Sequence, residues 1–238
     1  MQFLDLSFDI PADNLACDEA LLESAAAGES QAILRFWESP CYFVTLGYTN
    51  RAASEANLPV CEAQQVPILR RCSGGGTILQ GPGCLNYALI YPIEAGQALN
   101  VGATNDFVMQ TNRCAFERVM GVPVELAGQT DLAIEGRKFS GNAQKRKANW
   151  FLFHGTILLD FDLNLVQTLL LPPPKQPDYR AQRSHLEFIR NLGVSRQSVI
   201  ESLCQAWGAN QKTEVWPRER VETLKDEKYG RDEWNFKF

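Results

Sequence analysis

The sequence has few histidines, no closely spaced pair of cysteines and no long uninterrupted apolar run. Only two of its 238 residues are histidine, and its seven cysteines are scattered without any CxxC pair. Protein metal sites of the zinc type need clusters of these two residue types, so the sequence predicts no metal site. No stretch approaches the roughly 18 uninterrupted apolar residues of a membrane helix, and we expect no membrane span or membrane partner.

Positively charged side chains are outnumbered by negatively charged ones. Twenty-three Lys and Arg residues stand against 28 Asp and Glu, which gives a net charge of −5. This balance argues against non-specific nucleic-acid binding, because such binding needs a basic surface. The N-terminal MQFLDLSFDIPAD lacks the basic segment and apolar run of a signal peptide. An odd number of scattered cysteines is typical of reduced thiols, so we expect a cytoplasmic protein with no nucleic-acid partner.

The order of the predicted elements favours a mixed α+β domain. Apolar patterns and end signals predict helices at residues 11–28, 105–121 and 195–209, and Asn105 and Ser195 are the expected N-terminal caps. Runs of β-branched and aromatic residues predict strands at 32–38, 42–48, 66–71, 84–93 and 150–163. A tight turn at Glu135–Gly136 predicts a hairpin over residues 130–141. We expect a single domain over residues 1–238, in which helices flank a mixed sheet.

Three consecutive glycines follow two arginines in the segment RRCSGGGTILQGPGCLNYALIYP, residues 70–92. Gly76 and Gly81 have the spacing of a Walker loop, but Pro82 occupies the lysine position. A dinucleotide fingerprint fails too, because residues 77–79 continue a strand instead of opening a helix. Consecutive glycines still let a ligand approach the backbone and leave N–H groups free to face an anion. The alternative is a structural β-bulge between two tight turns.

Four polar side chains in and near this segment are candidates for one site. Arg70 and Arg71 alternate across a strand, so only one of them is expected to face a ligand. Asn86 is the polar exception on an otherwise apolar strand face. Lys138 leads into SGNA, residues 140–143, which we interpret as a second small-residue turn. A lone lysine is most often a solvated charge, but two such turns beside cations could surround a ligand with an anionic and an apolar part.

A histidine and two cysteines have ambiguous positions. His154 interrupts an apolar strand, and it shares a predicted face with Leu152 and Thr156. A histidine satisfied inside the core and a histidine at a functional site are both consistent with this pattern, and both interpretations stay open. Cys72 and Cys84 flank the glycines, and we expect small buried side chains there instead of nucleophiles.

Several motifs together resemble one family. RRCSGGGTI with a later LNY, then GRKFSGNAQ and FHGTILL, occur in an order and at separations that resemble the lipoate–protein ligase A family, part of the wider biotin and lipoate ligase/transferase group. The N-terminal NLACDEALL and LRFWESPCYFVTLGYTN also look like that family's opening helix and strands. The resemblance runs from about residue 11 to the final DEWNF. It implies a mixed sheet flanked by helices, related to biotin ligases and to class II synthetase catalytic domains.

The resemblance also implies a reaction and a set of site residues. Lipoate and ATP with Mg²⁺ would form lipoyl-AMP, and an acceptor lysine would then take the lipoyl group. The acceptor would be a lipoyl domain of a 2-oxoacid dehydrogenase E2 or of a glycine-cleavage H-type protein. Lys138 matches the family's essential lysine, whose ammonium stabilises negative charge on the acyl and phosphate oxygens. The implied positions around the adenylate are Arg70, Ser73, Gly74, Gly75, Gly76, Thr77, Asn86, Ser140, Gly141, Ala143 and His154.

Two departures from the family pattern are visible. Asn50 stands where many members have glutamine, and its shorter side chain puts any contact of that glutamine in doubt. In two-domain ligases an EWNF-like motif precedes a small accessory domain, whereas this sequence stops at DEWNFKF. We therefore expect a catalytic domain without the accessory domain, which a separate protein supplies or which is not needed.

Other functions stay open at this point. Related octanoyl or lipoyl transferases work without ATP through a thioester on a cysteine just upstream of the lysine motif. GQTDLAIEGRK contains no cysteine, which favours the ligase, although a cysteine-independent amidotransferase could keep the same lysine. The residue order of RRCSGGG argues against a biotin ligase. The retained Lys138 argues against a non-catalytic binding scaffold. The basic run Lys145–Lys147 is either a solvated loop or a docking patch for an acidic lipoyl domain.

Overall fold

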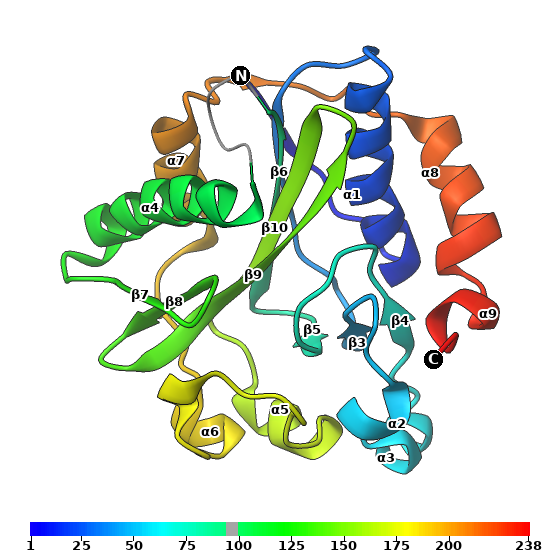
Figure 1. Cartoon of the computed structure of the whole chain (residues 1–238), viewed down its shortest axis with the longest axis vertical. Coiled ribbons are helices and arrows are strands. Elements are labelled where there is room, and N and C mark those ends of the chain that lie inside the picture. Colours follow the sequence, from blue (N-terminus) through cyan, green and yellow to red (C-terminus); the bar gives the residue numbers. More distant parts are fainter. Residues whose placement is uncertain (94–99) are drawn as a thin grey trace.

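The computed structural model describes residues 1–93 and 100–238, and a mixed sheet lies at its centre (Figure 1). In this main sheet the strand order is β11-β1-β2-β6-β10-β9-β8-β7. Strands β11, β1 and β2 run parallel, and every later neighbouring pair is antiparallel. The bounds are β1 Gln2–Asp5, β2 Ile33–Trp37, β6 Cys84–Pro92, β7 Glu125–Ala127, β8 Asp131–Ile134, β9 Arg137–Lys147, β10 Trp150–Leu158 and β11 Gln211–Lys212.

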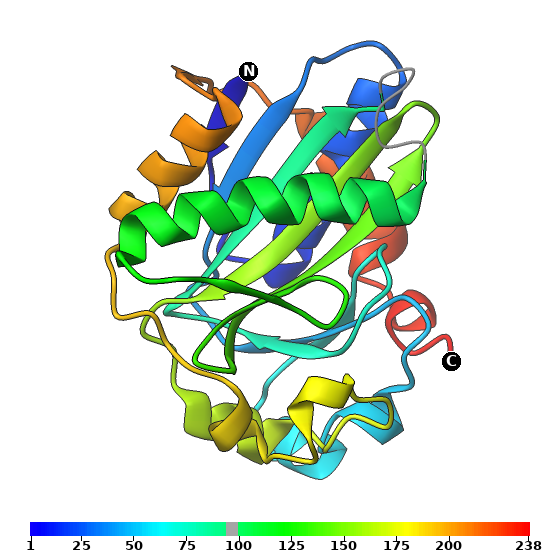
Figure 2. The same cartoon turned by 60° about the vertical axis from the view of Figure 1, so that its left-hand side comes forward.

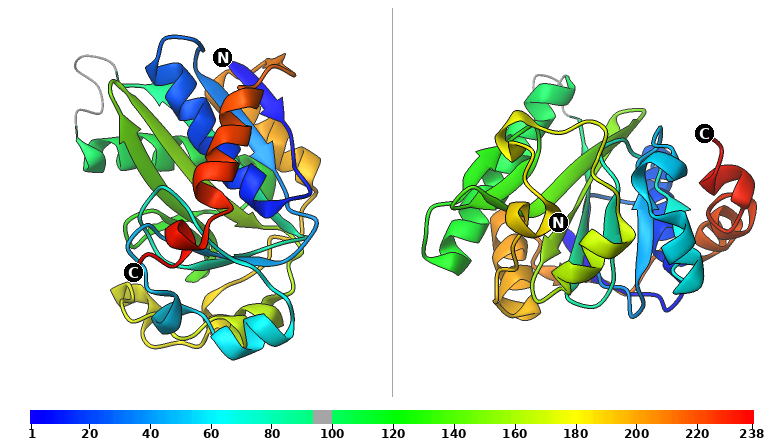
Figure 3. Two further views of the ribbon diagram at one scale, coloured as in Figure 1. Left: turned by 90° about the vertical axis from the view of Figure 1, so that its right-hand side faces the viewer. Right: turned by 90° about the horizontal axis from the view of Figure 1, so that it is seen from below.

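Helices cover both faces of the main sheet (Figure 2; Figure 3, left). Helices α1 (Pro11–Ala26) and α8 (Arg218–Leu224) pack on one face, and α4 (Val101–Met120) and α7 (Arg196–Trp207) on the other. Strand β6 shows the alternation: Tyr87 belongs to the core under α4 and α7, whereas Ala88 belongs to the core under α1. Because both faces are buried, the central strands read as nearly continuous apolar runs.

A second, three-stranded sheet carries the glycine-rich segment. Its order is β4-β3-β5, with β3 (Phe43–Leu46) parallel to β4 (Ile68–Arg70) and antiparallel to β5 (Ile78–Gln80). Four short helices gather around this end of the molecule (Figure 1; Figure 3, right). They are α2 Ala52–Glu55, α3 Leu58–Ala63, α5 Leu163–Leu169 and α6 His185–Phe188. The chain closes with the π-helix η2 (Lys225–Tyr229) and α9 (Asp232–Asn235), which contacts β4.

The predicted mixed sheet flanked by helices is confirmed. The Glu135–Gly136 turn is confirmed as well, with both φ angles positive at 53° and 66°, and Ser195 caps α7. The assignment of residues 1–238 to one catalytic domain stays a prediction. Among the described residues, no helix combines the length and the apolar character that crossing a bilayer would need.

Two local predictions were wrong. The cap of α4 is Asn100, whose side chain accepts from the Ala103 N–H at 2.8 Å, so the helix begins one turn before Asn105. The predicted turn at residues 140–143 is part of strand β9, and the basic run Lys145–Lys147 lies on the same strand instead of a loop. Close packing against this segment depends on Gly155 of β10, because a Cβ on it would lie 1.8 Å from Asn142 Oδ1.

Candidate active site

The register of three strands brings four of the predicted site residues to one face. His154 of β10 lies opposite Ala88 of β6 and Ala143 of β9, and its neighbour two residues on, Thr156, lies opposite Asn86 and Gly141. Residues directly opposite in antiparallel strands point to the same face. Asn86, Gly141, Ala143 and His154 therefore share the face covered by α1, which we call the α1 face.

Ser140 does not share the α1 face. It lies opposite Ile157, which belongs to the core under α4 and α7, and it is 1% exposed. Its hydroxyl accepts from Asn142 Nδ2 at 3.3 Å. A contact between Ser140 and a ligand on the α1 face would therefore have to come from its backbone.

Lys138 is held by an acidic partner that sequence reasoning missed. Its Nζ lies 2.8 Å from Oδ1 of Asp131, and the two side chains are 25% and 15% exposed. The second carboxylate oxygen of Asp131 accepts from the Tyr179 hydroxyl at 2.7 Å. Burial and the nearby Asp131 raise the pKa of Tyr179, so the phenol keeps the proton that it donates. Tyr179 lies in the 3₁₀-helix η1 (Asp178–Arg180), 48 residues along the chain, and no local pattern links the two.

Glycine at 141 makes room for the ammonium. A Cβ at this position would lie 2.5 Å from Lys138 Nζ and 3.5 Å from Asp131 Oδ1. The lysine thus lies over the backbone of its own strand, on the α1 face. Ala143 lies two residues further along β9, about 7 Å away. The glycine-rich loop meets the sheet there, since a Cβ on Gly75 would lie 3.5 Å from the Cβ of Ala143.

The loop Ser73–Gly76, here called the glycine loop, is shaped by Arg71. Nη2 of this arginine donates to the carbonyls of Gly74 at 2.6 Å and Gly76 at 2.7 Å. Arg71 is 7% exposed, and burial lowers its pKa to about 10, so it remains a cation at neutral pH. Gly75 between them has a φ of +89°, a conformation that favours glycine. The loop is therefore preformed by contacts within the protein.

Arg70, the arginine that we predicted to face the ligand, is fully buried. Its Nη1 donates to three carbonyls, those of Gly47, Tyr48 and Asn50, at 2.7–3.0 Å. Its Nη2 donates to the Asn235 carbonyl at 2.8 Å, so this side chain fastens α9 to the loop after β3. The alternation rule correctly separated the two arginines, but only their long-range partners show which one holds the glycine loop. A ligand contact by Arg70 stays a prediction.

Asn50 and Thr77 brace the end of the glycine loop. Asn50 Nδ2 donates to Thr77 Oγ1 and to Glu55 Oε1, both at 3.1 Å. Burial raises the pKa of Glu55, which also accepts from Thr77. The shorter asparagine side chain thus has partners of its own. Asn86, 3% exposed, donates to the Cys84 carbonyl at 3.2 Å and is not a solvated residue.

Both ring nitrogens of His154 have partners. Nε2 lies 2.6 Å from Ser73 Oγ in the glycine loop, and Nδ1 lies 3.3 Å from Oδ2 of Asp18 on α1. The other oxygen of Asp18 accepts from Arg35 of β2 at 2.6 Å. His154 is therefore a nearly buried histidine with both ring nitrogens satisfied inside the protein, next to the glycine loop, and a ligand contact by it stays a prediction. Asp18 was missed, although an acidic residue inside an apolar helix was a signal that could have found it.

The two cysteines nearest the glycines are buried. Cys72 and Cys84 are 4% and 0% exposed, which confirms their prediction as small buried side chains. Burial raises the pKa of Cys72 to about 12 and that of Cys84 further still. Thiolates are the nucleophilic form of cysteine, so neither residue is suited to covalent catalysis. Residues 1–93 and 100–238 contain no group of three His, Cys, Asp or Glu side chains that could hold a metal ion.

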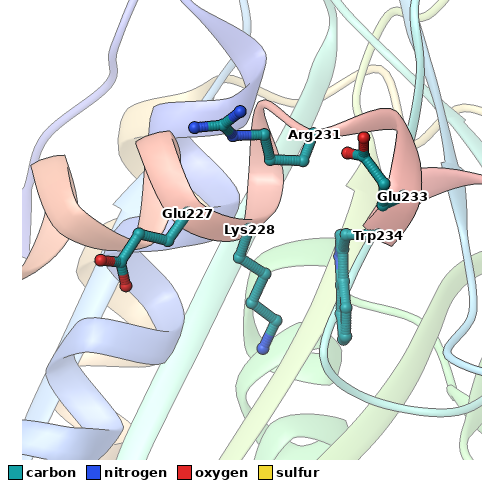
Figure 4. Close-up of a pocket in the computed structure, with 5 residues that line it drawn as sticks. All are labelled: Glu227, Lys228, Arg231, Glu233 and Trp234. Carbon is teal, nitrogen blue, oxygen red and sulfur yellow. The ribbon is translucent and has the colours of Figure 1, made fainter.

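A shallow surface hollow lies near the C-terminus (Figure 4), and one of its lining residues, Trp234, donates from Nε1 to the Arg70 carbonyl at 2.8 Å. Its volume is about 490 Å³, and Glu227, Lys228, Arg231, Glu233 and Trp234 line it. The Lys228 ammonium lies 4.1 Å from the centre of the Trp234 ring and forms an ion pair with Glu19 at 2.6 Å. None of the predicted site residues lines this hollow.

Comparison with known proteins identifies the family. The model of the family described as the lipoyl protein ligase A/B catalytic domain matches residues 10–208. The chain belongs to this family. It therefore falls among the lipoate ligase and transferase enzymes, as the motifs of the sequence predict.

Curated relatives include both ligases and transferases. The chain is 28% identical to the "Probable lipoate-protein ligase A" of Mycoplasma pneumoniae, over 96% of this chain and 69% of that protein. It is 27% identical to lipoate–protein ligase 1 of Staphylococcus aureus, over 95% and 70%. It is 29% identical to the octanoyltransferase LipM of Geobacillus kaustophilus, over 99% and 98%.

Solved structures share the fold at lower identity. A Thermoplasma acidophilum protein with bound lipoic acid superposes with a TM-score of 0.84 at 20% identity, over 100% of this chain and 99% of that one. Lipoate-protein ligase A bound with ATP gives 0.84 at 22% identity, over 99% and 98%. A bi-partite lipoate protein ligase from T. acidophilum, described together with its E2 lipoyl domain, gives 0.82 at 22% identity, over 99% and 95%.

Proposed function

We propose that this chain is an ATP-dependent lipoate–protein ligase, which forms lipoyl-AMP and transfers the lipoyl group to a lysine of an acceptor lipoyl domain. One observation carries the proposal: the Lys138 ammonium is held on the α1 face beside the glycine loop, in a sequence that has no cysteine between 114 and 204. An adenylate needs a cation at this place, whereas a thioester mechanism needs a thiol.

The chemistry follows from the donors that remain available. An ammonium has three N–H donors, and Asp131 takes one of them. The other two can reach an acyl oxygen and a phosphate oxygen as the lipoate carboxylate attacks the α-phosphate of ATP and pyrophosphate leaves. In the second step the acceptor amine attacks the acyl carbon, and AMP leaves with the electron pair. Negative charge develops on the same oxygens in both steps, and one fixed cation stabilises both transition states.

The residues present fit Mg²⁺ only as a companion of ATP. Mg²⁺ is usually bound by one or two carboxylates together with substrate phosphates. The described part of the chain offers no cage of three metal-binding side chains, but Asp131 provides one carboxylate directly beside Lys138. We propose that Asp131 would be the protein carboxylate available to a metal that arrives with the nucleotide, which would offset the negative charge of the phosphates.

The acceptor and the setting belong to the same proposal. A T. acidophilum ligase of this fold is described with its E2 lipoyl domain, and we propose an E2 or H-type lipoyl domain as acceptor here. Lys145 lies beside Tyr48, its Nζ 5.8 Å from the ring centre, and would meet acidic side chains of that acceptor. A separate accessory protein would be needed only if this chain alone does not form lipoyl-AMP, which is the alternative that the experiment below tests. All seven cysteines, which lie in the described part of the chain, are unpaired, and a cytoplasmic setting agrees with that.

A second candidate function is an ATP-independent octanoyl or lipoyl transferase. The observation that favours it is the similarity to octanoyltransferase LipM, which extends over 98% of that protein. Because Cys72 and Cys84 are buried with raised pKa values, such a transferase would have to pass the acyl group directly between proteins at Lys138.

One experiment separates these functions. The purified chain is incubated with lipoate, ATP–Mg²⁺ and an apo lipoyl domain, and the acceptor is weighed by intact-protein mass spectrometry. We expect an ATP-dependent gain of one lipoyl group, absent with Lys138→Ala. Modification only when lipoyl-AMP is supplied would assign activation to a partner protein. Modification only from an octanoyl- or lipoyl-bearing donor protein, without ATP, would replace the ligase by the transferase.

A further inference from the structure

A buried line of hydrogen bonds runs from helix α1 to the glycine loop. It passes from Asp18 through His154 to Ser73, with Arg35 at one end and Arg71 at the other. Asp18, Ser73 and Arg35 are at most 3% exposed, and the His154 side chain is 11% exposed. We call Asp18, His154 and Ser73 the relay.

The two arginines fix the direction of every bond in the relay. A guanidinium can only donate, and Arg71 Nε donates to Ser73 Oγ at 3.1 Å. The serine hydroxyl then directs its own hydrogen to His154 Nε2 at 2.6 Å. A nitrogen that accepts carries no proton, so the imidazole proton is on Nδ1 and points to Asp18 Oδ2. Oδ1 of the same carboxylate accepts from Arg35.

The reverse arrangement leaves a group unsatisfied. If His154 donated from Nε2, Ser73 Oγ would receive two donors, and its own hydrogen would lack an acceptor among the described residues. An unsatisfied polar hydrogen at 1% exposure is costly. The tautomer with its proton on Nδ1 is therefore the one that the hydrogen-bond partners of His154 select.

We propose that Asp18 and His154 are positioning residues, which set the tautomer that holds Ser73 and thereby place the glycine loop around the acyl-adenylate. The proposal rests on the proposed function, because it assigns the loop to that intermediate. Ser73 is the first residue of the loop, and its carbonyl also accepts from the Tyr48 N–H at 2.8 Å. Fixing its side chain as well as its backbone fixes the point from which Gly74–Gly76 extend.

Asp18→Asn tests the relay directly. Arg35 demands an acceptor, so the amide oxygen must face the arginine and the amide NH₂ must face His154 Nδ1. The imidazole then has to carry its proton on Nε2. Ser73 Oγ would receive hydrogen bonds from both His154 Nε2 and Arg71 Nε, and its own hydrogen would lose its acceptor. The protein has only two histidines, so ring-nitrogen chemical shifts from ¹⁵N-labelled protein report each one, with His185 as internal reference.

We expect the Nδ1–H tautomer at His154 in the wild type and the Nε2–H tautomer in Asp18→Asn, with His185 the same in both. An Nε2–H tautomer in the wild type, or no change in the variant, overturns the relay. Should Asp18→Asn fail to fold, Ser73→Ala takes its place: it removes the donor to Nε2, leaves the Asp18–Arg35 pair intact, and must shift the Nε2 resonance of His154.

Affinity and kinetics then test the positioning role. Asp18→Asn and Ser73→Ala should each weaken binding of a non-hydrolysable lipoyl-adenylate analogue by about 10-fold, and the double variant should be no worse than the weaker single one. Ser202→Ala, which removes a buried hydroxyl bonded to the Ala115 carbonyl, should bind like the wild type. The positioning role is refuted if the losses of affinity add in the double variant. It is refuted as well if Asp18→Asn changes the His154 tautomer but leaves binding of the analogue unchanged. A wild type that ignores the analogue refutes the proposed function, while the tautomer result still stands.

Discussion

Gly141→Ala should misplace the Lys138 ammonium, the proposed catalytic group, without removing it. The new Cβ would lie 2.5 Å from Lys138 Nζ and 2.7 Å from Cε, whereas ordinary contacts begin at 3.4 Å. The lysine must therefore retreat by about 1 Å, and a displacement of that size can cost about 100-fold in rate. The fold should hardly change, because Gly141 does not have a positive φ and the obstructing atoms are the flexible end of a side chain. We expect the melting temperature to stay within about 2 °C of the wild type.

The assay is single-turnover formation of lipoyl-AMP with the enzyme in excess, together with thermal unfolding of the same samples. Gly102→Ala on α4 is the matched control, since the nearest atom to its Cβ would be a side-chain oxygen at 3.3 Å and it lies outside the site. Wild-type rates for Gly141→Ala would refute the reasoning that the position of Lys138 matters. An equal loss in the control would show that added methyl groups act through stability instead.

Three further predictions concern individual charges. Lys138→Met should slow adenylation by two to three orders of magnitude, about 3–4 kcal/mol of barrier, with unchanged circular dichroism; a loss below 10-fold would contradict its catalytic role. Glu55→Gln tests a raised pKa: the folded state binds the proton more tightly, so wild-type stability falls as pH rises above the ordinary 4.5. The variant should gain stability relative to the wild type between pH 4 and 7 in thermal unfolding, and a constant difference would exclude this coupling. Lys145→Glu should raise the acceptor KM and flatten its salt dependence while lipoyl-AMP formation is unchanged; an unaltered KM would dismiss the docking patch.

The local features of the fold were predictable, because each depends on a few neighbouring residues. Ser195 caps α7, and Glu135–Gly136 turns the hairpin, since the cap needs one side-chain acceptor and the turn needs two residues with positive φ. The predicted turn at residues 140–143 was wrong for a physical reason. Small residues allow both tight turns and close strand packing, and the neighbours that decide between the two are known only from the folded sheet: Asn142 packs against Gly155 of β10, and Gly141 leaves room for Lys138.

The site was only half predictable. Motif resemblance predicts Lys138 and the glycine loop as site residues, and the groups that hold them in place come from distant parts of the chain. Tyr179 reaches Asp131 across 48 residues, and Asp18 reaches His154 across 136. Such contacts depend on how α1 and η1 pack on the finished sheet, and neither periodicity nor spacing encodes that.

The charges of the site predict that only the activation step depends strongly on Mg²⁺. The two cations nearest the glycine loop each have a carboxylate close by, Lys138 with Asp131 and Arg71 with Glu55, so their positive charge is already largely balanced. A triphosphate with several negative charges needs an added divalent cation there, whereas lipoyl-AMP carries a single phosphate. Chelation by EDTA should therefore abolish lipoylation from lipoate and ATP, yet change transfer from supplied lipoyl-AMP by less than about 2-fold. Equal loss of both steps would mean that the metal also acts in acyl transfer, and that Lys138 alone does not stabilise the departing phosphate.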